Sequence, residues 1–309
     1  MASFRMQARG PFSLTTAARF VMDFPAGQGG SQEARLELAF PAWSPIGVRV
    51  TGDLHAEIVA NPGAVPVPRI RAMVERILSL DVDGTDFPAV AERDTVVSGL
   101  QARFPGLRPV LFYSPYEAAA WTIIGQRIRM TQAATIKTRL ATELGDTIDF
   151  GDRTLPSFPP PERLADLGEF PGLTDRKVAQ LRSLGEAAAL GKLDPDRLRA
   201  QDPADALAEL RTLPGIGPFS AELILLRGAG HPDGFPASEQ RLHRAMAAVY
   251  HLGPEPEPAR LAAVAAGWRP FRTWVALLLR IWLEDVTQEI ADGRRVLSLP
   301  DRIDPAPRR

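Results

Sequence analysis

The stretch that decides the fold is RTLPGIGPFSAELILLRGAGHPDGFPASEQRLHRAM, which runs from Arg211 to Met246. Gly215 and Gly217 lie in a short turn between one helical segment and a second that begins at Pro218. Glycine allows positive φ angles and lets another backbone approach, because it has no Cβ. The free amides of the following helix can hold an anion. The turn is therefore either a backbone clamp for phosphate or a plain connection between two helices.

A carboxylate follows this turn at the start of a third predicted helix, RLHRAMAAVY. Glu239 is the acid at that boundary. In one interpretation its negative charge has a catalytic role. In the other, Ser238 caps the helix and Glu239 favours its first turn. Asp233 is the alternative acid in the same segment.

The chain on both sides of this stretch is helical from Val67 onward. Apolar residues recur at helical spacing in 68–80, and a single helical stretch is expected over 87–106. Ser114 and Glu117 predict a capping box with proline at the first helical position. The helix that starts there is apolar on nearly every side, so we expect it to be buried. A further helix is expected near 131–145, ending at Gly145.

The first seventy residues have a different pattern. Period-two alternation predicts strands within 3–8, 34–40, 46–52 and 54–60, and a helix is expected over 10–24. The predicted fold class is α+β, with a small N-terminal antiparallel sheet domain and an all-helical body. We predict the domain boundaries 1–110, 111–295 and a polar tail at 296–309.

Composition excludes several kinds of site. The chain has 309 residues, a net charge of −1 and no cysteine. Disulfides, thiolate zinc sites, iron–sulfur clusters and a cysteine nucleophile are therefore excluded. The four histidines are scattered without metal-ligand spacing. The N-terminus lacks an apolar signal core and no membrane-spanning segment is evident, so a cytoplasmic location is expected.

A net charge of −1 gives no global attraction to nucleic acid. A DNA partner would need a local basic face, because phosphate neutralisation supplies most of the affinity. The candidates for that face are basic residues expected at helix ends or turns. They are Arg127, Arg129, Lys137, Arg139, Arg176 and Lys177. For any one of them, a solvated helix surface is the more common explanation.

The chain resembles the helix–hairpin–helix DNA glycosylase superfamily, and within it the bacterial 3-methyladenine DNA glycosylase II family. The resemblance covers nearly the whole chain, and four stretches carry it. They are SPYEAAAWTIIGQRI (114–128), LPGIGPFSAELILLRG (213–228), DGFPASEQRLHRA (233–245) and AAGWRPFRTWVALLLRIW (265–282). It implies a three-part fold and the removal of alkylated purines from double-stranded DNA by base flipping and hydrolysis of the N-glycosidic bond.

The resemblance assigns the catalytic role to Glu239, where the family has an aspartate. Ser238 stands where a second acid is often found. Glutamate keeps the charge and adds a methylene, so the position of the carboxylate changes. A carboxylate here stabilises the oxocarbenium character that builds up on the sugar when the base leaves.

The resemblance also assigns residues to base stacking, DNA binding and cation binding. The base-pocket positions are Phe219, Leu223 and Trp282, with leucine where the family often has tyrosine. The DNA-binding positions are Gln126, Arg127, Gly215, Ile216, Gly217 and Ser220. Arg127 replaces the usual apolar wedge that fills the gap left by the flipped base. The backbone carbonyls of Arg211, Leu213 and Ile216 match positions that hold a monovalent cation, Na⁺ or K⁺, and no other cofactor is implied.

A branch of the superfamily that also nicks the strand uses a Schiff-base lysine just after the hairpin. Phe219 occupies that position, and no lysine occurs between Lys192 and Arg309. The expected enzyme is therefore a monofunctional glycosylase of base excision repair. It would act as a monomer on alkylated or abasic DNA, associated with the bacterial nucleoid and not with a membrane.

Two other classes of function remain possible. Because Glu239 departs from the family's aspartate, the chain is alternatively a non-catalytic binder of damaged or distorted DNA. The third possibility is a structural relic whose hairpin binds a partner protein. A DNA-binding assay at low salt separates this third possibility from the first two.

Overall fold

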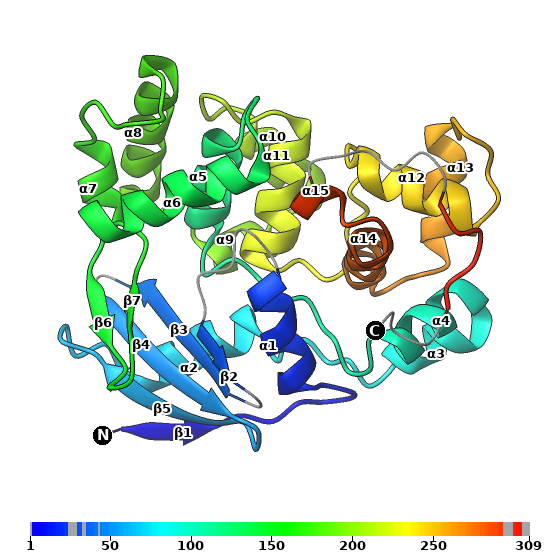
Figure 1. Cartoon of the computed structure of the whole chain (residues 1–309), viewed down its shortest axis with the longest axis horizontal. Helices are drawn as coiled ribbons and strands as arrows, with labels where there is room; N and C mark the ends of the chain where they lie inside the picture. The colour runs from blue at the N-terminus through cyan, green and yellow to red at the C-terminus, as the bar shows by residue number, and fades with distance from the viewer. Residues whose placement is uncertain (1, 24–29, 33–34, 43, 293–298, 305–309) are drawn as a thin grey trace.

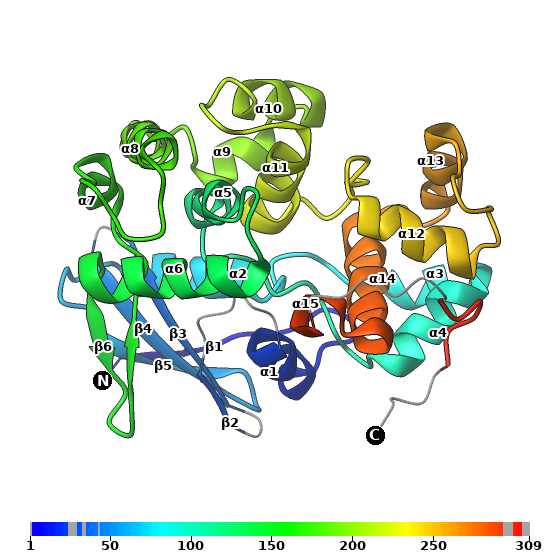
Figure 2. The same cartoon turned by 45° about the horizontal axis from the view of Figure 1, so that its top comes forward.

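The computed structural model describes the chain except for residues 1, 24–29, 33–34, 43, 293–298 and 305–309. A sheet with its covering helices lies at one end, and two groups of helices lie beside it (Figures 1 and 2). The class is α+β with a small antiparallel sheet and a helical body, as the sequence predicts. The tail predicted at 296–309 lies largely outside the described residues.

The sheet has five strands in the order β1-β5-β4-β3-β2, and all neighbours are antiparallel. The strands are β1 (Ser3–Arg5), β2 (Gly30–Gln32), β3 (Arg35–Pro41), β4 (Pro45–Thr51) and β5 (His55–Ala60). Strand β2 is absent from the sequence-based expectation. Leu36, Leu38 and Phe40 are fully buried on one face, which packs against α1 (Leu14–Asp23) and α2 (Val67–Ile77). Successive residues that alternate in the sequence thus point to opposite faces of the sheet.

The other sheet face is also covered, which the sequence did not predict. A hairpin of β6 (Thr147–Asp149) and β7 (Thr154–Pro156) packs on it through Ile148. Next to this contact the carboxylate of Glu37 is completely buried and pairs with arginines from both sides. These are Arg35 on its own strand, Arg49 on β4 and Arg153 in the hairpin. Because a buried charge needs partners, this cluster fixes the hairpin to the sheet.

The helical stretch expected over 87–106 is two helices, so the prediction of one was wrong. Asp94 separates α3 (Phe87–Arg93) from α4 (Thr95–Arg103) with extended backbone angles. Its carboxylate accepts the amides of Val96 and Val97, at 3.0 and 3.2 Å. Aspartate is a preferred N-cap, and here it starts a second helix where periodicity alone suggests continuation.

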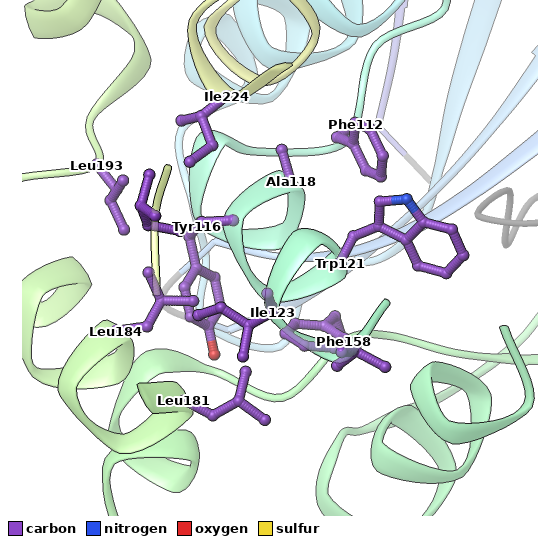
Figure 3. Packing of buried hydrophobic residues seen from close by; sticks show 14 of the residues in the cluster. Phe112, Tyr116, Ala118, Trp121, Ile123, Phe158, Leu181, Leu184, Leu193 and Ile224 are labelled. Carbon is purple, nitrogen blue, oxygen red and sulfur yellow. The ribbon is translucent and has the colours of Figure 1, made fainter. Parts of the chain in front are cut away.

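Helix α5 (Pro115–Ile124) is the buried axis of the first helical group, as predicted: all ten of its residues are buried. Figure 3 shows Tyr116 close to Leu181 and Leu184, with Trp121 on the other side of the helix. Ser114 caps the helix by accepting the amide of Glu117 at 3.1 Å. The other half of the predicted capping box is not formed, because the Glu117 carboxylate pairs with Lys137, 2.6 Å away.

The remaining helices complete the two helical groups. The first group adds α6 (Met130–Leu144), α7 (Pro161–Ala165), α8 (Asp175–Ala189), α9 (Pro195–Ala200), α10 (Pro203–Leu210), α11 (Pro218–Leu223) and the π-helical η1 (Ile224–Ala229). The second has α12 (Gln240–Val249), α13 (Pro258–Ala266), α14 (Arg272–Thr287) and α15 (Glu289–Asp292).

Three large apolar cores divide the molecule, and they cross the boundary predicted at residue 110. Helices α3 and α4 pack with α12–α14 in one core, although they precede that boundary. The sheet with α1 and α2 forms a second core, and α5 with α11 and η1 belongs to the third. Two chain segments far apart in sequence therefore build the C-terminal core.

Candidate active site

The LPGIG segment is a tight turn between α10 and α11. The amide of Ile216 donates to the carbonyl of Leu213 at 3.1 Å, and Gly215 has a φ of +87°. Proline followed by a residue with positive φ is the arrangement of a type II turn. Ile216 is 6% exposed and anchors the turn in the core. The sequence prediction of a tight glycine turn between two helices is confirmed.

The two glycines of the turn serve different purposes. The φ of +87° at Gly215 favours glycine, and a Cβ there would also lie 2.7 Å from the end of the Gln180 side chain, which would have to move. A Cβ on Gly217 would meet nothing within 4 Å, and its φ of −95° suits any residue. Nothing in the described structure explains a glycine at 217. An external partner that approaches the backbone there would explain it.

The first turn of α11 leaves backbone amides available to such a partner. The first intrahelical hydrogen bond is donated by Ala221 to the carbonyl of Gly217, at 2.9 Å. The amides of Phe219 and Ser220 therefore precede the helical ladder. Together with Gly217 they form the open, positively polarised end of the helix.

Glu239 is the N-cap of α12, a role that one of the two interpretations of the sequence gave to Ser238. Its Oε1 accepts the amide of Arg241 at 3.1 Å, and its Oε2 lies 3.6 Å from the Nε of Arg280 on α14. The side chains of Glu239 and Arg280 are 18% and 19% exposed. The carboxylate is thus held by a helix N-terminus and a guanidinium, and it still reaches solvent.

Glu222 on α11 is a functional candidate that the sequence analysis missed. Its Oε2 accepts the amide of Ser238 at 2.9 Å, and its Oε1 accepts the Ser238 hydroxyl at 3.2 Å. Burial raises the pKa of the Glu222 carboxyl, and the charge of Glu239 adds to that rise, against the opposing effect of the bonds from Ser238. The helix after the hairpin is therefore hydrogen-bonded directly to Ser238, the residue before Glu239.

Arg280 was also missed. It stands alone in the apolar run WVALLLRIW, as Glu222 stands alone in FSAELILL. Charged residues inside apolar helices are rarely buried without a partner, so a lone charge in such a run is the signal that could have identified both. Burial lowers the pKa of Arg280, and the neighbouring Glu239 opposes that shift.

Asp233, the alternative acid, is fully engaged elsewhere. Its Oδ1 lies 2.7 Å from the Nε of Arg272, and its Oδ2 lies 3.1 Å from the Nη1 of Arg269. These bonds fix the loop between η1 and α12 to the first residue of α14 and to the segment just before it. Asp233 therefore positions the loop.

The predicted base-pocket residues differ in exposure. Phe219 is 43% exposed, which is unusual for a large aromatic side chain and suits a stacking surface. Leu223 is partly buried against the core. Trp282 is 1% exposed within the C-terminal core, so in this conformation its ring faces other side chains and no base could stack on it.

Gln126 and Arg127 follow α5 beside the hairpin. The Nε2 of Gln126 donates to the carbonyl of Gly215 at 2.8 Å, which links this turn to the glycine turn. Arg127 is exposed and has a φ of +57°. Such backbone angles are uncommon for a residue other than glycine and often occur at functional sites.

Two of the basic residues considered for the DNA face are buried, so that expectation was wrong for them. Lys137 is 1% exposed and pairs with Glu117. Lys177 is 8% exposed and donates to the carbonyl of Ile124 at the end of α5, at 2.7 Å. The exposed residues among the candidates are Arg127, Arg129 and Arg176. Arg139 pairs with Glu143 one turn along α6.

The backbone carbonyls of Arg211, Leu213 and Ile216 all belong to the glycine turn. Carbonyl oxygen is a suitable ligand for a hard monovalent cation, and the Leu213 carbonyl uses one lone pair for Ile216. In the part of the chain that the structure describes, no cluster of acidic and histidine side chains could hold a metal ion. Nor is any described helix long and apolar enough to cross a membrane.

Comparisons with known proteins find DNA glycosylases both by sequence and by structure. No protein-family model matches the chain. It is 26% identical to the DNA-3-methyladenine glycosylase of Bacillus subtilis over 205 residues, which are 65% of this chain and 67% of that protein. It is 30% identical over 217 residues to the probable bifunctional transcriptional activator/DNA repair enzyme AlkA of Mycobacterium tuberculosis, covering 69% of this chain and 42% of that protein. The fold matches the 3-methyladenine DNA-glycosylase from Archaeoglobus fulgidus, with a TM-score of 0.76, 19% identity and coverage of 92% and 99%.

Proposed function

We propose that the chain belongs to the helix–hairpin–helix DNA glycosylase superfamily, as its similarity to DNA-3-methyladenine glycosylases in sequence and in fold supports. Its proposed activity is that of a monofunctional DNA glycosylase that removes alkylated purines, of the 3-methyladenine type, from double-stranded DNA. The observation that carries the proposal is the pair of hydrogen bonds from Ser238 to Glu222. They join the helix of the glycine turn to the N-terminus of α12, where Glu239 lies. One ligand could therefore contact both.

Recognition would begin at the glycine turn. The amides of Gly217, Phe219 and Ser220 would hold a DNA phosphate, which positions the duplex without reading its sequence. Arg127 would enter the gap left by the flipped nucleotide, and the exposed ring of Phe219 would stack on the base. A monovalent cation bound by the carbonyls of Arg211, Leu213 and Ile216 would add positive charge beside that phosphate.

The reaction would replace the base with water. The bond between C1′ and the base nitrogen breaks, its electron pair goes to the base, and C1′ gains oxocarbenium character. The carboxylate of Glu239 would stabilise that charge, and water would attack C1′ and lose a proton. An alkylated purine that carries a positive charge becomes neutral as it leaves, so it needs no proton donor.

The enzyme would be monofunctional and would need no cofactor apart from the cation. The lysines of the chain are Lys137, Lys177 and Lys192. The first two are buried and bonded, and Lys192 lies in the turn between α8 and α9, outside the segment that contains Phe219 and Glu239. Phe219 itself has no amine. We propose that it acts as a monomer on the nucleoid of a bacterial cytoplasm.

Excision from methylated duplex DNA tests the proposal. The wild-type protein is incubated with methylated and with undamaged duplex, and released bases are separated and quantified. Release of methylated purine from the first substrate alone supports the proposal. Tight binding to abasic DNA without any release would support the alternative, a non-catalytic binder of damaged DNA.

A further inference from the structure

Glu222 has the properties of a second important carboxylate in this site. It lies on α11, one helical turn after the glycine turn, and it is half-buried. Both of its carboxylate oxygens accept hydrogen bonds from Ser238. Such a two-point contact fixes the direction of the bonded residue as well as its distance.

Ser238 directly precedes Glu239, so its orientation sets the start of α12. The Glu239 amide donates to the carbonyl of Pro236 at 3.2 Å, and Phe235 stacks on His243 with ring centroids 6.3 Å apart. The loop that leads to Glu239 is therefore packed from behind by α12 itself. On the side that faces the hairpin, this loop is hydrogen-bonded to the charged side chain of Glu222.

We propose that Glu222 is the positioning residue of this site, which fixes the catalytic carboxylate of Glu239 relative to the glycine turn through its two hydrogen bonds with Ser238. This inference rests on the proposed function. It explains why a carboxylate stands in an otherwise apolar helix face. It also fixes the backbone position from which the longer Glu239 side chain extends, because Ser238 is hydrogen-bonded to the helix that would bind the phosphate.

The ionised form of Glu222 accepts two charge-assisted hydrogen bonds from Ser238, whereas the protonated form can accept the Ser238 amide and donate to its hydroxyl only through weaker, neutral bonds. The charged and titratable groups around this contact are Glu239, Arg241 and His243 on α12 and Arg280 on α14. Protonation of Glu222 would thus loosen the contact while Arg280 still pairs with Glu239. Activity would fall as the pH drops and Glu222 becomes protonated, which happens at a higher pH than for an ordinary glutamate because its pKa is raised.

The test compares Glu222→Ala, Glu222→Gln and Ser238→Ala with the wild-type protein on methylated duplex DNA. We expect Glu222→Ala to lower the single-turnover excision rate by about 10-fold or more, because a displacement near 1 Å in a catalytic group can cost about 10²-fold. Its affinity for abasic DNA should stay within about 2-fold of wild type. Glu222→Gln should lower the rate less and lack the acidic limb that the wild type shows. Glu186→Gln, an exposed glutamate on α8, is the control.

A double-mutant cycle completes the experiment. If Glu222 acts through Ser238, the rate of the double alanine variant should match that of Glu222→Ala alone. Rates for Glu222→Ala and Glu222→Gln equal to wild type, with the same acidic limb, would overturn the positioning role while leaving the glycosylase function intact. Should Glu222→Ala fail to fold, the pH profile of Glu222→Gln decides the question. Absence of release by the wild type would overturn the proposed function, and with it this inference.

Discussion

At the scale of single residues, the site is a set of charges held in place by fixed partners. Glu239 is an N-cap that also faces Arg280, so two features stabilise its negative charge. Glu222 is in the opposite situation: burial and the nearby Glu239 make its charged form less favourable. A partly buried carboxyl whose pKa is raised beside a second carboxylate is common in active sites.

Replacing Glu222 by glutamine should stabilise the fold at neutral pH. The raised pKa of Glu222 means that the folded protein binds a proton more tightly than the unfolded chain does. The wild type therefore loses stability as pH rises through that interval, and glutamine removes the loss. Glutamine can still accept the Ser238 amide and donate to its hydroxyl.

Thermal unfolding between pH 4 and pH 8 is the measurement. The melting temperature of Glu222→Gln should exceed that of the wild type at pH 8, and the difference should shrink towards pH 4. A variant that is less stable at every pH would show instead that the charged contact holds the fold together.

Incubation with abasic DNA and borohydride should trap no covalent adduct. A Schiff base needs an unprotonated amine at the sugar, and Phe219 stands where the lyase branch has its lysine. The reaction is followed by gel electrophoresis of labelled DNA, with a known glycosylase/lyase as the positive control. A trapped complex would direct attention to the N-terminal amine.

At the scale of elements, the glycine turn shows which parts of the site the sequence predicts. The turn, the following helix and the acid at the start of α12 are local features, and all were identified from the sequence. The contacts of Glu222 with Ser238 and of Arg280 with Glu239 join residues far apart in the chain. Periodicity contains no information about such pairs, although a lone charge in an apolar helix indicates that a partner exists.

The break at Asp94 and the burial of Lys137 illustrate the same limit. Asp94 fits the middle of an amphipathic helix as well as an N-cap, and the side-chain bonds to Val96 and Val97 decide between them. Lys137 was a candidate for the DNA face as a basic residue expected at a helix end or turn, whereas it lies in the middle of α6 and is buried. Its partner Glu117 lies on another helix, and only the packing of α5 against α6 brings the two together.

The two glycines of the turn should respond differently to substitution. Gly217→Leu should fold as well as the wild type, because its Cβ position is open and its φ suits any residue. The same variant should bind undamaged and abasic duplex at least about 10-fold more weakly, since leucine keeps the backbone from the phosphate. Gly215→Ala should instead destabilise the protein by at least about 1 kcal/mol, because Gly215 has a positive φ and contacts Gln180.

Fluorescence anisotropy with labelled duplex and thermal unfolding of both variants test this contrast. Unchanged affinity of Gly217→Leu for both DNAs would contradict the backbone clamp. A strong loss of stability in that variant would show that residue 217 has a structural role inside the protein.

At the scale of the whole molecule, the site lies where two of the three cores meet. The glycine turn and Glu222 belong to the helical group around α5, whereas Glu239 and Arg280 belong to the C-terminal group. That second core includes α3 and α4 from before residue 110, which no domain boundary drawn along the sequence would show. The family resemblance predicted the architecture, whereas the packing between segments far apart in the chain could be learned only from the structure.

The salt dependence of DNA binding should be weak for a DNA-repair protein. The chain has a net charge of −1, and Arg127, Arg129 and Arg176 are the exposed members of the basic set. If Arg129 and Arg176 each neutralise one phosphate while Arg127 fills the gap left by the flipped nucleotide, the slope of log K against log[salt] is about −2. Arg129→Ala should reduce its magnitude by about 1. A wild-type slope of about −6 or steeper would mean that other basic residues form the DNA face.

The central claim is that Glu239 is the catalytic carboxylate, and single-turnover release of methylated purines by Glu239→Gln tests it most directly. Glutamine keeps the size of the side chain and removes its charge, so release should fall by about 10²-fold or more while abasic DNA is still bound. Glu239→Asp, which restores a preferred N-cap and the shorter acid, should match or exceed the wild-type rate. Equal release by the wild type and Glu239→Gln at equal protein concentration would contradict the claim.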